Sequence, residues 1–138
     1  MARYLLDTNI LSEASSLNGN AQVIARLDEN APSIATAAVV MHELLYGCYR
    51  LPVSRRRAAL DRYLNGLLSS SMPVLDYTIE AANWHAYERA RLSQMGRTPP
   101  YADGQIAAIA AVNQLILVTR NVTDFADFQD LQLENWFA

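Results

Sequence analysis

Four acidic residues stand where short apolar runs meet helical stretches, and their placement suggests shared chemistry. Asp7 directly follows the apolar run 3–6, and Asp124 follows the apolar run 115–119. Asp103 begins an alanine-rich stretch, and Glu43 lies inside an apolar one. Carboxylates within a few ångströms of each other disfavour one another's ionisation unless a cation neutralises them. The pattern therefore predicts one acidic site, provided that the fold gathers the four side chains.

The cation for such a site cannot be a lysine. All 11 basic residues are arginine, and the chain contains no lysine. A hard divalent ion with oxygen ligands, Mg²⁺ or Mn²⁺, suits an all-carboxylate site. Such an ion lowers the pKa of a bound water and stabilises charge on a phosphate under attack. The lack of lysine also argues against a phosphate-loop nucleotide enzyme, which needs one.

Each acid also has a simpler structural explanation. Asp7 and Asp103 could cap helix N-termini, and Asp124 could belong to a turn in Asn-Val-Thr-Asp. Glu43 could be a core acid paired with an arginine. Capping gives no reason for every acid to share one edge of a sheet, so the joint placement favours the metal site. Gly47, one turn after Glu43, would leave room for a phosphate to approach.

The elements that must position these acids follow from the hydrophobic pattern. Short apolar runs predict strands at 3–6, 33–36, 73–75 and 115–119, with a weak edge strand at 131–133. Helices are predicted from Asp7 onward and at 21–29, 37–50, 54–68, 78–95 and 103–112. This alternation indicates a three-layer α/β/α sandwich, with a short parallel sheet flanked by helices. We expect residues 1–138 to form a single domain, because this length suits one and is short for two.

The fold class predicts where the acids meet. Ligands of open parallel sheets bind at the carboxyl ends of strands, near the point where strand order reverses. We expect strands 3–6 and 115–119 to flank this point in a flavodoxin-like order, which puts Asp7 and Asp124 on one rim. Asp103 begins the helix that leads into the second of these strands, so it emerges on the same rim. Glu43 lies inside an apolar helix, where an acid is costly without a cation or strong donors.

Composition narrows the class of protein. The formal net charge of −3 argues against a passive nucleic-acid coat, which would be basic. The single cysteine, Cys48, can form no internal disulfide and is interpreted as a core residue in a reducing compartment. We see neither a signal-peptide pattern nor a run of about 18 apolar residues, and expect a cytoplasmic protein with no membrane segment. His42 and His85 lack a spacing suited to zinc and are interpreted as structural.

Four segments resemble the motifs of PIN-domain ribonuclease toxins of the VapC/FitB type. They are residues 4–13 (YLLDTNILSE), 42–47 (HELLYG), 101–110 (YADGQIAAIA) and 117–125 (LVTRNVTDF). They occur in the order and spacing of that family and span essentially the whole chain. The resemblance implies a Mg²⁺- or Mn²⁺-dependent endoribonuclease that is the toxin of a type II toxin–antitoxin pair. It also implies a homodimer, an RNA substrate, and a cognate antitoxin that covers the site and contacts DNA on behalf of the complex.

The resemblance also implies roles for individual residues. Asp7 and Asp103 would be metal ligands, Glu43 would support the metal or its water, and Asp124 would close the cluster or serve a second ion. A supporting shell would orient these ligands, consisting of Thr8, Asn9, Thr119 and Asn121. The implied reaction is attack of a metal-activated water, in line, on an RNA phosphodiester, leaving a 5′-phosphate and a 3′-hydroxyl. Candidate RNA or antitoxin contacts are Arg120 on the rim and the cluster Arg50, Arg55, Arg56 and Arg57, for which a solvated helix face is the alternative.

Two other functions compete with the nuclease. The chain could be a non-catalytic PIN subunit of a DNA-bound regulatory complex, its carboxylates serving as a docking site for partner arginines. Four intact acids exceed what docking needs, which favours the enzyme. A haloacid-dehalogenase-type phosphatase needs a second aspartate two residues after the first, but Asn9 stands there and no lysine follows.

Overall fold

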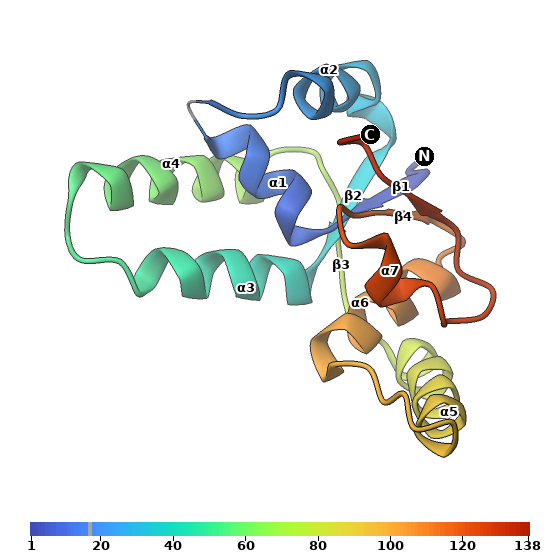
Figure 1. Ribbon diagram of the computed structural model, residues 1–138. Coiled ribbons are helices and arrows are strands. Elements are labelled where there is room, and N and C mark those ends of the chain that lie inside the picture. Colours follow the sequence, from blue (N-terminus) through green and yellow to red (C-terminus); the bar gives the residue numbers. More distant parts are fainter. Residues whose placement is uncertain (17) are drawn as a thin grey trace.

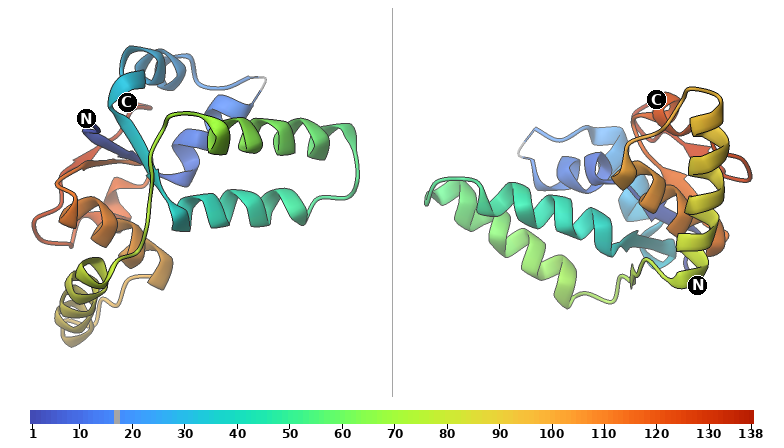
Figure 2. Two further views of the ribbon diagram at one scale, coloured as in Figure 1. Left: turned by 180° about the vertical axis from the view of Figure 1, so that it is seen from behind. Right: turned by 90° about the horizontal axis from the view of Figure 1, so that it is seen from below.

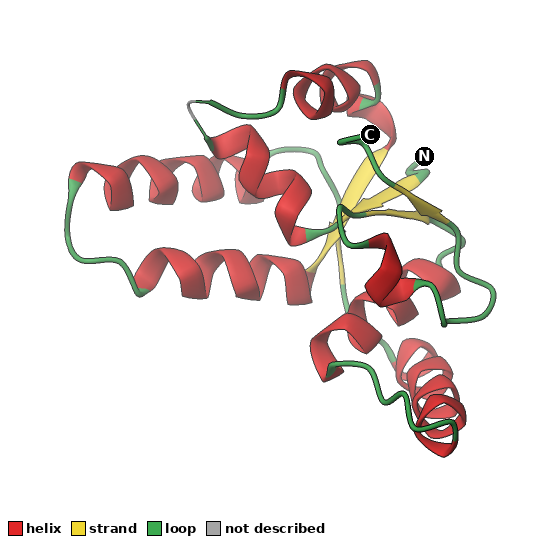
Figure 3. Ribbon diagram, in the orientation of Figure 1, coloured by secondary structure: helices red, strands yellow, loops and turns green. Residues whose placement is uncertain are grey.

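The computed structural model describes residues 1–16 and 18–138. Within these residues a parallel sheet of five short strands runs through the molecule in the order β3-β2-β1-β4-β5 (Figures 1 and 3). The strands are β1 (Tyr4–Leu6), β2 (Ile34–Ala37), β3 (Val74–Leu75), β4 (Ile116–Val118) and β5 (Leu133–Glu134). Every predicted strand is thus present, with its ends within about two residues of the expected positions.

Helices cover both faces of the sheet. The first four, on one face, are α1 (Thr8–Ser15), α2 (Ala21–Glu29), α3 (Ala38–Tyr49) and α4 (Arg55–Ser69). The other face carries α5 (Ile79–Gln94), α6 (Tyr101–Val112) and α7 (Val122–Phe125), and the views in Figure 2 show the same division. The predicted three-layer α/β/α architecture is therefore confirmed. The sequence pattern missed α7 and a 3₁₀ turn at Ala31–Ser33, because elements of three or four residues are too short to show helical periodicity.

The strand order differs from the flavodoxin-like order that we predicted. In that order the third strand lies next to the first, whereas here β3 pairs with β2 at the edge of the sheet. The prediction was wrong because local hydrophobic patterns do not encode which short strands pair. Strands β1 and β4 are nevertheless neighbours, with Leu5 opposite Leu117 and Leu6 opposite Val118. The strand order reverses between them, at the place where the acids were expected.

Strands β1 and β4 lie in the hydrophobic core of the protein. Leu5, Leu6 and Leu117 have no exposed surface, and each buried leucine stabilises the fold by about 1.5–3 kcal/mol. Small residues in α6, including Ala107 and Ala108, are also fully buried and permit close packing. Cys48 is a free, buried core residue, as its surroundings in the sequence indicated. In the part of the chain that the structure describes, no helix combines the length and apolar character that crossing a bilayer requires.

Candidate active site

Asp7 stands at the end of β1 and caps the N-terminus of α1. Its Oδ1 accepts a hydrogen bond of 2.8 Å from the Thr8 amide, so Asp7 does cap the helix. Its Oδ2 accepts a second hydrogen bond of 2.8 Å from the Thr119 hydroxyl, across the switch point. The side chain is buried, and burial raises the pKa of Asp7 despite both hydrogen bonds. A cap alone would not require burial or the contact with Thr119.

Thr119 is the centre of a polar network that joins the ends of β1 and β4. Its buried hydroxyl donates to Asp7 and accepts from Asn9 Nδ2 at 3.4 Å and from the Asn121 amide at 3.1 Å. Asn9 in turn accepts a hydrogen bond of 3.0 Å from the Arg120 amide. Three residues of the predicted supporting shell are therefore connected to one another and to Asp7.

Glu43 lies on the exposed side of α3, which corrects our expectation of an acid in the core. The buried stripe of this helix consists of Val40, Met41, Leu44 and Cys48, and position 43 falls at its border. Glu43 Oε2 accepts a long hydrogen bond of 3.4 Å from the Thr8 hydroxyl. Partial burial raises the pKa of Glu43, and the charges of Asp7 and Asp103 raise it further. The alternative explanation, a core acid paired with an arginine, is also wrong, because the ion pairs among the described residues do not involve Glu43.

Asp103 occupies the first turn of α6 but does not begin the helix. The helix begins at Tyr101, with Pro100 at the cap position and no side-chain capping bond. Proline suits this end of a helix because its ring fixes φ and it has no N–H to satisfy. The half-buried carboxyl of Asp103 has its pKa raised by burial, and then by the charges of Asp7 and Asp124. The capping explanation of Asp103 is thereby excluded.

Asp124 stands at the margin of this group. It lies in α7 rather than in the turn that was the alternative explanation, and it is exposed. Its charge contributes to the raised pKa of Asp103. The structure thus gathers Asp7, Glu43 and Asp103 and places Asp124 beside the last of these.

The gathered acids face an open hollow of about 400 Å³ at the carboxyl edge of the sheet. Its lining consists of Asp7, Thr8, Asn9, Ser12, Glu13, Glu43, Asp103, Arg120, Asn121 and Phe137. The sequence analysis missed three of these, Ser12, Glu13 and Phe137. Ser12 and Glu13 follow Asp7 within α1 and could have been found by helical spacing, whereas nothing local indicates Phe137. Across the described residues, no three His, Cys, Asp or Glu side chains are already arranged as a finished metal site.

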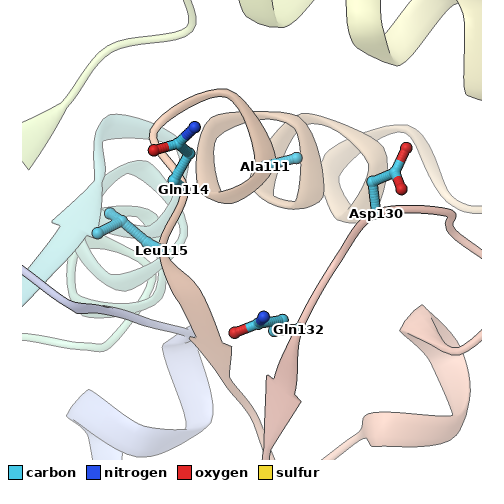
Figure 4. Close-up of a pocket in the computed structure, with 5 residues that line it drawn as sticks. All are labelled: Ala111, Gln114, Leu115, Asp130 and Gln132. Atoms are coloured by element: carbon cyan, nitrogen blue, oxygen red, sulfur yellow. The ribbon is translucent and has the colours of Figure 1, made fainter.

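A second hollow, of about 310 Å³, opens at the opposite edge of the sheet (Figure 4). It is lined by Ala111, Gln114, Leu115, Asp130 and Gln132, which lie near the amino ends of β4 and β5. Gln114 and Asp130 adopt left-handed backbone conformations with φ of 57° and 60°, as the chain turns toward each strand. This lining has one acid and no basic residue, so it lacks the several carboxylates and the arginine that line the hollow at the carboxyl edge.

The arginines predicted to contact RNA or an antitoxin fall into two places. Arg120 lines the acidic hollow. The cluster of Arg50, Arg55, Arg56 and Arg57 lies around the connection between α3 and α4, at the projecting end of that hairpin (Figure 1). Arg50 is seven residues beyond Glu43, roughly 10 Å along the helix axis at the usual rise. Arg57 donates to the Leu51 carbonyl at 3.2 Å. The cluster is thus separate from the acidic hollow.

Both the sequence and the fold are similar to those of known proteins. Residues 4–131 match the PIN domain family. The chain is 32% identical over 136 residues to the tRNA(fMet)-specific endonuclease VapC of Shigella flexneri, covering 99% of each protein. The fold matches FitAcB from Neisseria gonorrhoeae with a TM-score of 0.88 and 27% identity, over 97% of this chain and 98% of that chain. It matches DNA-bound VapBC from Salmonella typhimurium with a TM-score of 0.84 and 27% identity, over 99% of both chains.

Proposed function

The chain belongs to the PIN-domain family and to its VapC ribonuclease group, and we propose that it is a divalent-metal-dependent endoribonuclease, the toxin of a type II toxin–antitoxin pair. One observation carries the proposal: the carboxylates of Asp7, Glu43 and Asp103 line one hollow, where burial and then the charge of Asp7 raise the pKa of the other two. Concentrating like charges in this way costs stability, which a bound cation would offset. The hydrogen bond from the Thr119 hydroxyl holds the Asp7 carboxylate in place, and the Asn121 amide donates to the same hydroxyl.

The donor set of the hollow fits Mg²⁺ or Mn²⁺, since its acids offer only oxygen. We assign Asp7 and Asp103 as ligands, Glu43 as a ligand or a support for the attacking water, and Asp124 as the residue that closes the cluster. Glu43 is held by one long hydrogen bond of 3.4 Å, so its carboxylate can turn into the hollow at little cost. When bound, the ion would lower the pKa of a water molecule and stabilise charge on the phosphate.

The remaining residues of the hollow position these groups. Each oxygen of Asp7 accepts one hydrogen bond, from Thr8 or Thr119, and keeps a second lone pair directed elsewhere. Asn9 holds the backbone at Arg120, whose guanidinium we assign to the scissile phosphate. We propose that water attacks in line with the leaving 3′-oxygen, which yields a 5′-phosphate and a 3′-hydroxyl.

We further propose that the chain forms a homodimer in the cytoplasm and binds a cognate antitoxin, through which the complex contacts DNA. The fold similarity to the DNA-bound VapBC of Salmonella typhimurium supports this part of the proposal. We assign the arginine cluster on the α3–α4 hairpin to contact with the antitoxin rather than with the scissile phosphate, because the cluster lies away from the acidic hollow. Co-expression with a candidate antitoxin, followed by light scattering of the purified material with and without that partner, measures both stoichiometries. A monomer in both preparations would contradict this assignment.

The nuclease proposal is tested by incubating the purified, partner-free chain with total RNA in Mg²⁺, Mn²⁺ or EDTA. Asp7→Asn and Asp103→Asn are compared with Asp28→Asn, which changes an exposed acid on α2 outside the hollow. We expect discrete, metal-dependent cuts from the wild type and from Asp28→Asn, and none from the two site variants. End-labelling of the fragments identifies the 5′-phosphate.

Equal cleavage by wild type, Asp7→Asn and Asp103→Asn would show that these acids are not needed. A folded wild type that cuts no RNA alone, but represses transcription with its partner, would favour the regulatory subunit instead. The assay therefore separates the two functions that the sequence left open.

A further inference from the structure

Arg120 lies in an acidic hollow without pairing with an acid. It is the only basic side chain among the residues that line the hollow. Among the described residues, the ion pairs within 4.0 Å do not include Arg120. Its guanidinium instead lies over the ring of Phe137, with 4.8 Å between the guanidinium carbon and the ring centroid. This distance is within the range of a cation–π interaction.

The chain holds Phe137 in place through its neighbours. Trp136 is buried, with 1% of its surface exposed, and packs edge-on against Tyr4 of β1 at 5.2 Å between ring centroids. The Trp136 indole N–H donates to Glu134 at 3.0 Å, and the Phe137 amide donates to Asn135 Oδ1 at 2.9 Å. A buried anchor and a local turn therefore present the half-buried Phe137 ring to the hollow.

We propose that Phe137 is a positioning residue that keeps Arg120 off the carboxylates and ready for an RNA phosphate. The inference rests on the proposed nuclease function, which needs an arginine that is free to bind the phosphate. An arginine beside several carboxylates would form charge-assisted hydrogen bonds with them, which would occupy both the acids and the arginine. The aromatic face offers the guanidinium a different resting place, and a weak one. A phosphate entering the hollow can therefore draw the arginine away, because a guanidinium–phosphate contact is the stronger interaction.

A double-mutant cycle tests whether Phe137 acts through Arg120. Binding of a short single-stranded RNA is measured in Mg²⁺ by fluorescence anisotropy, with every variant made in the cleavage-deficient Asp103→Asn chain. We expect Phe137→Leu to weaken binding about two- to fivefold, because Arg120 then pairs with a carboxylate, and a contact of the size of an exposed ion pair must break before the arginine meets the phosphate. Phe137→Trp, which keeps an aromatic face, should restore it. In an Arg120→Ala background, Phe137→Leu should have no further effect. Tyr87→Leu, which removes an exposed ring on α5, serves as the control.

A second readout does not depend on RNA or on activity. A guanidinium stacked on a ring shifts the NMR signals of the arginine Cδ protons upfield, and we expect this shift for Arg120 in the wild type and in Phe137→Trp. It should disappear in Phe137→Leu while the thermal melting temperature stays close to that of the wild type.

The possible results separate the two proposals. A ring-current shift in a wild type that neither binds nor cuts RNA would contradict both the nuclease and the role of Phe137 in serving it, while leaving the stacking intact. An equal effect of Phe137→Leu with and without Arg120 would overturn the positioning role, because the ring would then act directly on RNA or on the fold. Absence of the shift in the wild type would overturn it as well.

Discussion

Replacing Gly104 with alanine tests how the fold sets the position of Asp103. Gly104 is buried in α6, and a Cβ atom built there meets the imidazole of His85 from α5, with Cδ2 only 2.6 Å away. Non-bonded carbons pack at about 3.5–4.0 Å, so the ring or the helix must move by about 1 Å. His85 cannot simply turn aside, because it is 2% exposed and its Nδ1 is hydrogen-bonded to the Tyr77 hydroxyl at 2.8 Å.

The expected free-energy change combines two opposing effects. Overpacking a core costs about 1–3 kcal/mol, and alanine in place of glycine stabilises a helix interior by about 0.8–1 kcal/mol. Gly104→Ala should therefore lower the free energy of unfolding by up to roughly 2 kcal/mol. The RNA cleavage rate should fall as well, because the displaced turn of α6 carries Asp103. Urea denaturation at constant m-value measures the first effect.

The His85→Ala background makes this prediction specific. Without the imidazole the new methyl group enters empty space, so Gly104→Ala should stabilise this variant by about 1 kcal/mol, the helix-propensity gain alone. The control is Gly66→Ala in α4, where nothing lies within 4 Å of the added Cβ. It should stabilise the wild type and the His85→Ala variant equally. If Gly104→Ala destabilises both backgrounds to the same extent, His85 is not the obstacle and the reasoning fails.

Three further predictions concern ionisable side chains. Asp103→Asn should raise the melting temperature of the metal-free protein at pH 7, because the folded state raises the pKa of this carboxyl and so disfavours its charge. This gain should vanish as the pH falls and the wild-type carboxyl is protonated, and Mg²⁺ should stabilise the wild type but not the variant. Glu88→Gln should cost about 1.5–3 kcal/mol at neutral pH, since the buried Glu88 accepts two hydrogen bonds of 2.9 Å from Arg91. The pKa of Glu88 is lowered from 4.5 chiefly by those bonds, so urea midpoints of wild type and variant should differ fully above about pH 4.5 and converge below it. Tyr63→Phe removes a hydrogen bond of 2.8 Å to the Leu11 carbonyl and should cost about 0.5–1.5 kcal/mol. Burial raises the pKa of Tyr63 to about 12, so the urea-measured difference should be constant up to about pH 10 and shrink only as the pH rises toward 12.

The sequence predicts those parts of the site that depend on local signals. Asp7 and Thr119 each adjoin a strand whose apolar run is visible in the sequence, and β1 and β4 pair as expected. Asp103 could be placed because an alanine-rich helix leads directly into β4. The error at Asp103 was small, since the prediction began the helix at this acid, whereas the helix begins at Tyr101 with Pro100 at the cap position.

Other features depend on contacts that no local pattern encodes. The position of β3 outside β2 is set by pairing over two residues, Val74 and Leu75, which leave little trace in the sequence. Glu43 was misplaced because a residue at the border of an apolar stripe cannot be told from one within it when the partner helices are unknown. Phe137 reaches the hollow only because the chain after β5 packs against β1 through Trp136 and Tyr4, a contact between residues more than a hundred positions apart.

The geometry ties the formation of the site to the formation of the sheet. Asp7 belongs to the turn after β1 and Thr119 to the turn after β4, so their 2.8 Å hydrogen bond exists only when these strands are paired. That bond and the Thr8 amide offset part of the cost of burying the Asp7 carboxylate, which still keeps a raised pKa. The acids that crowd Asp7 add repulsion that the fold leaves uncompensated. Pairing of β1 with β4, two strands of the buried core, must therefore offset this repulsion.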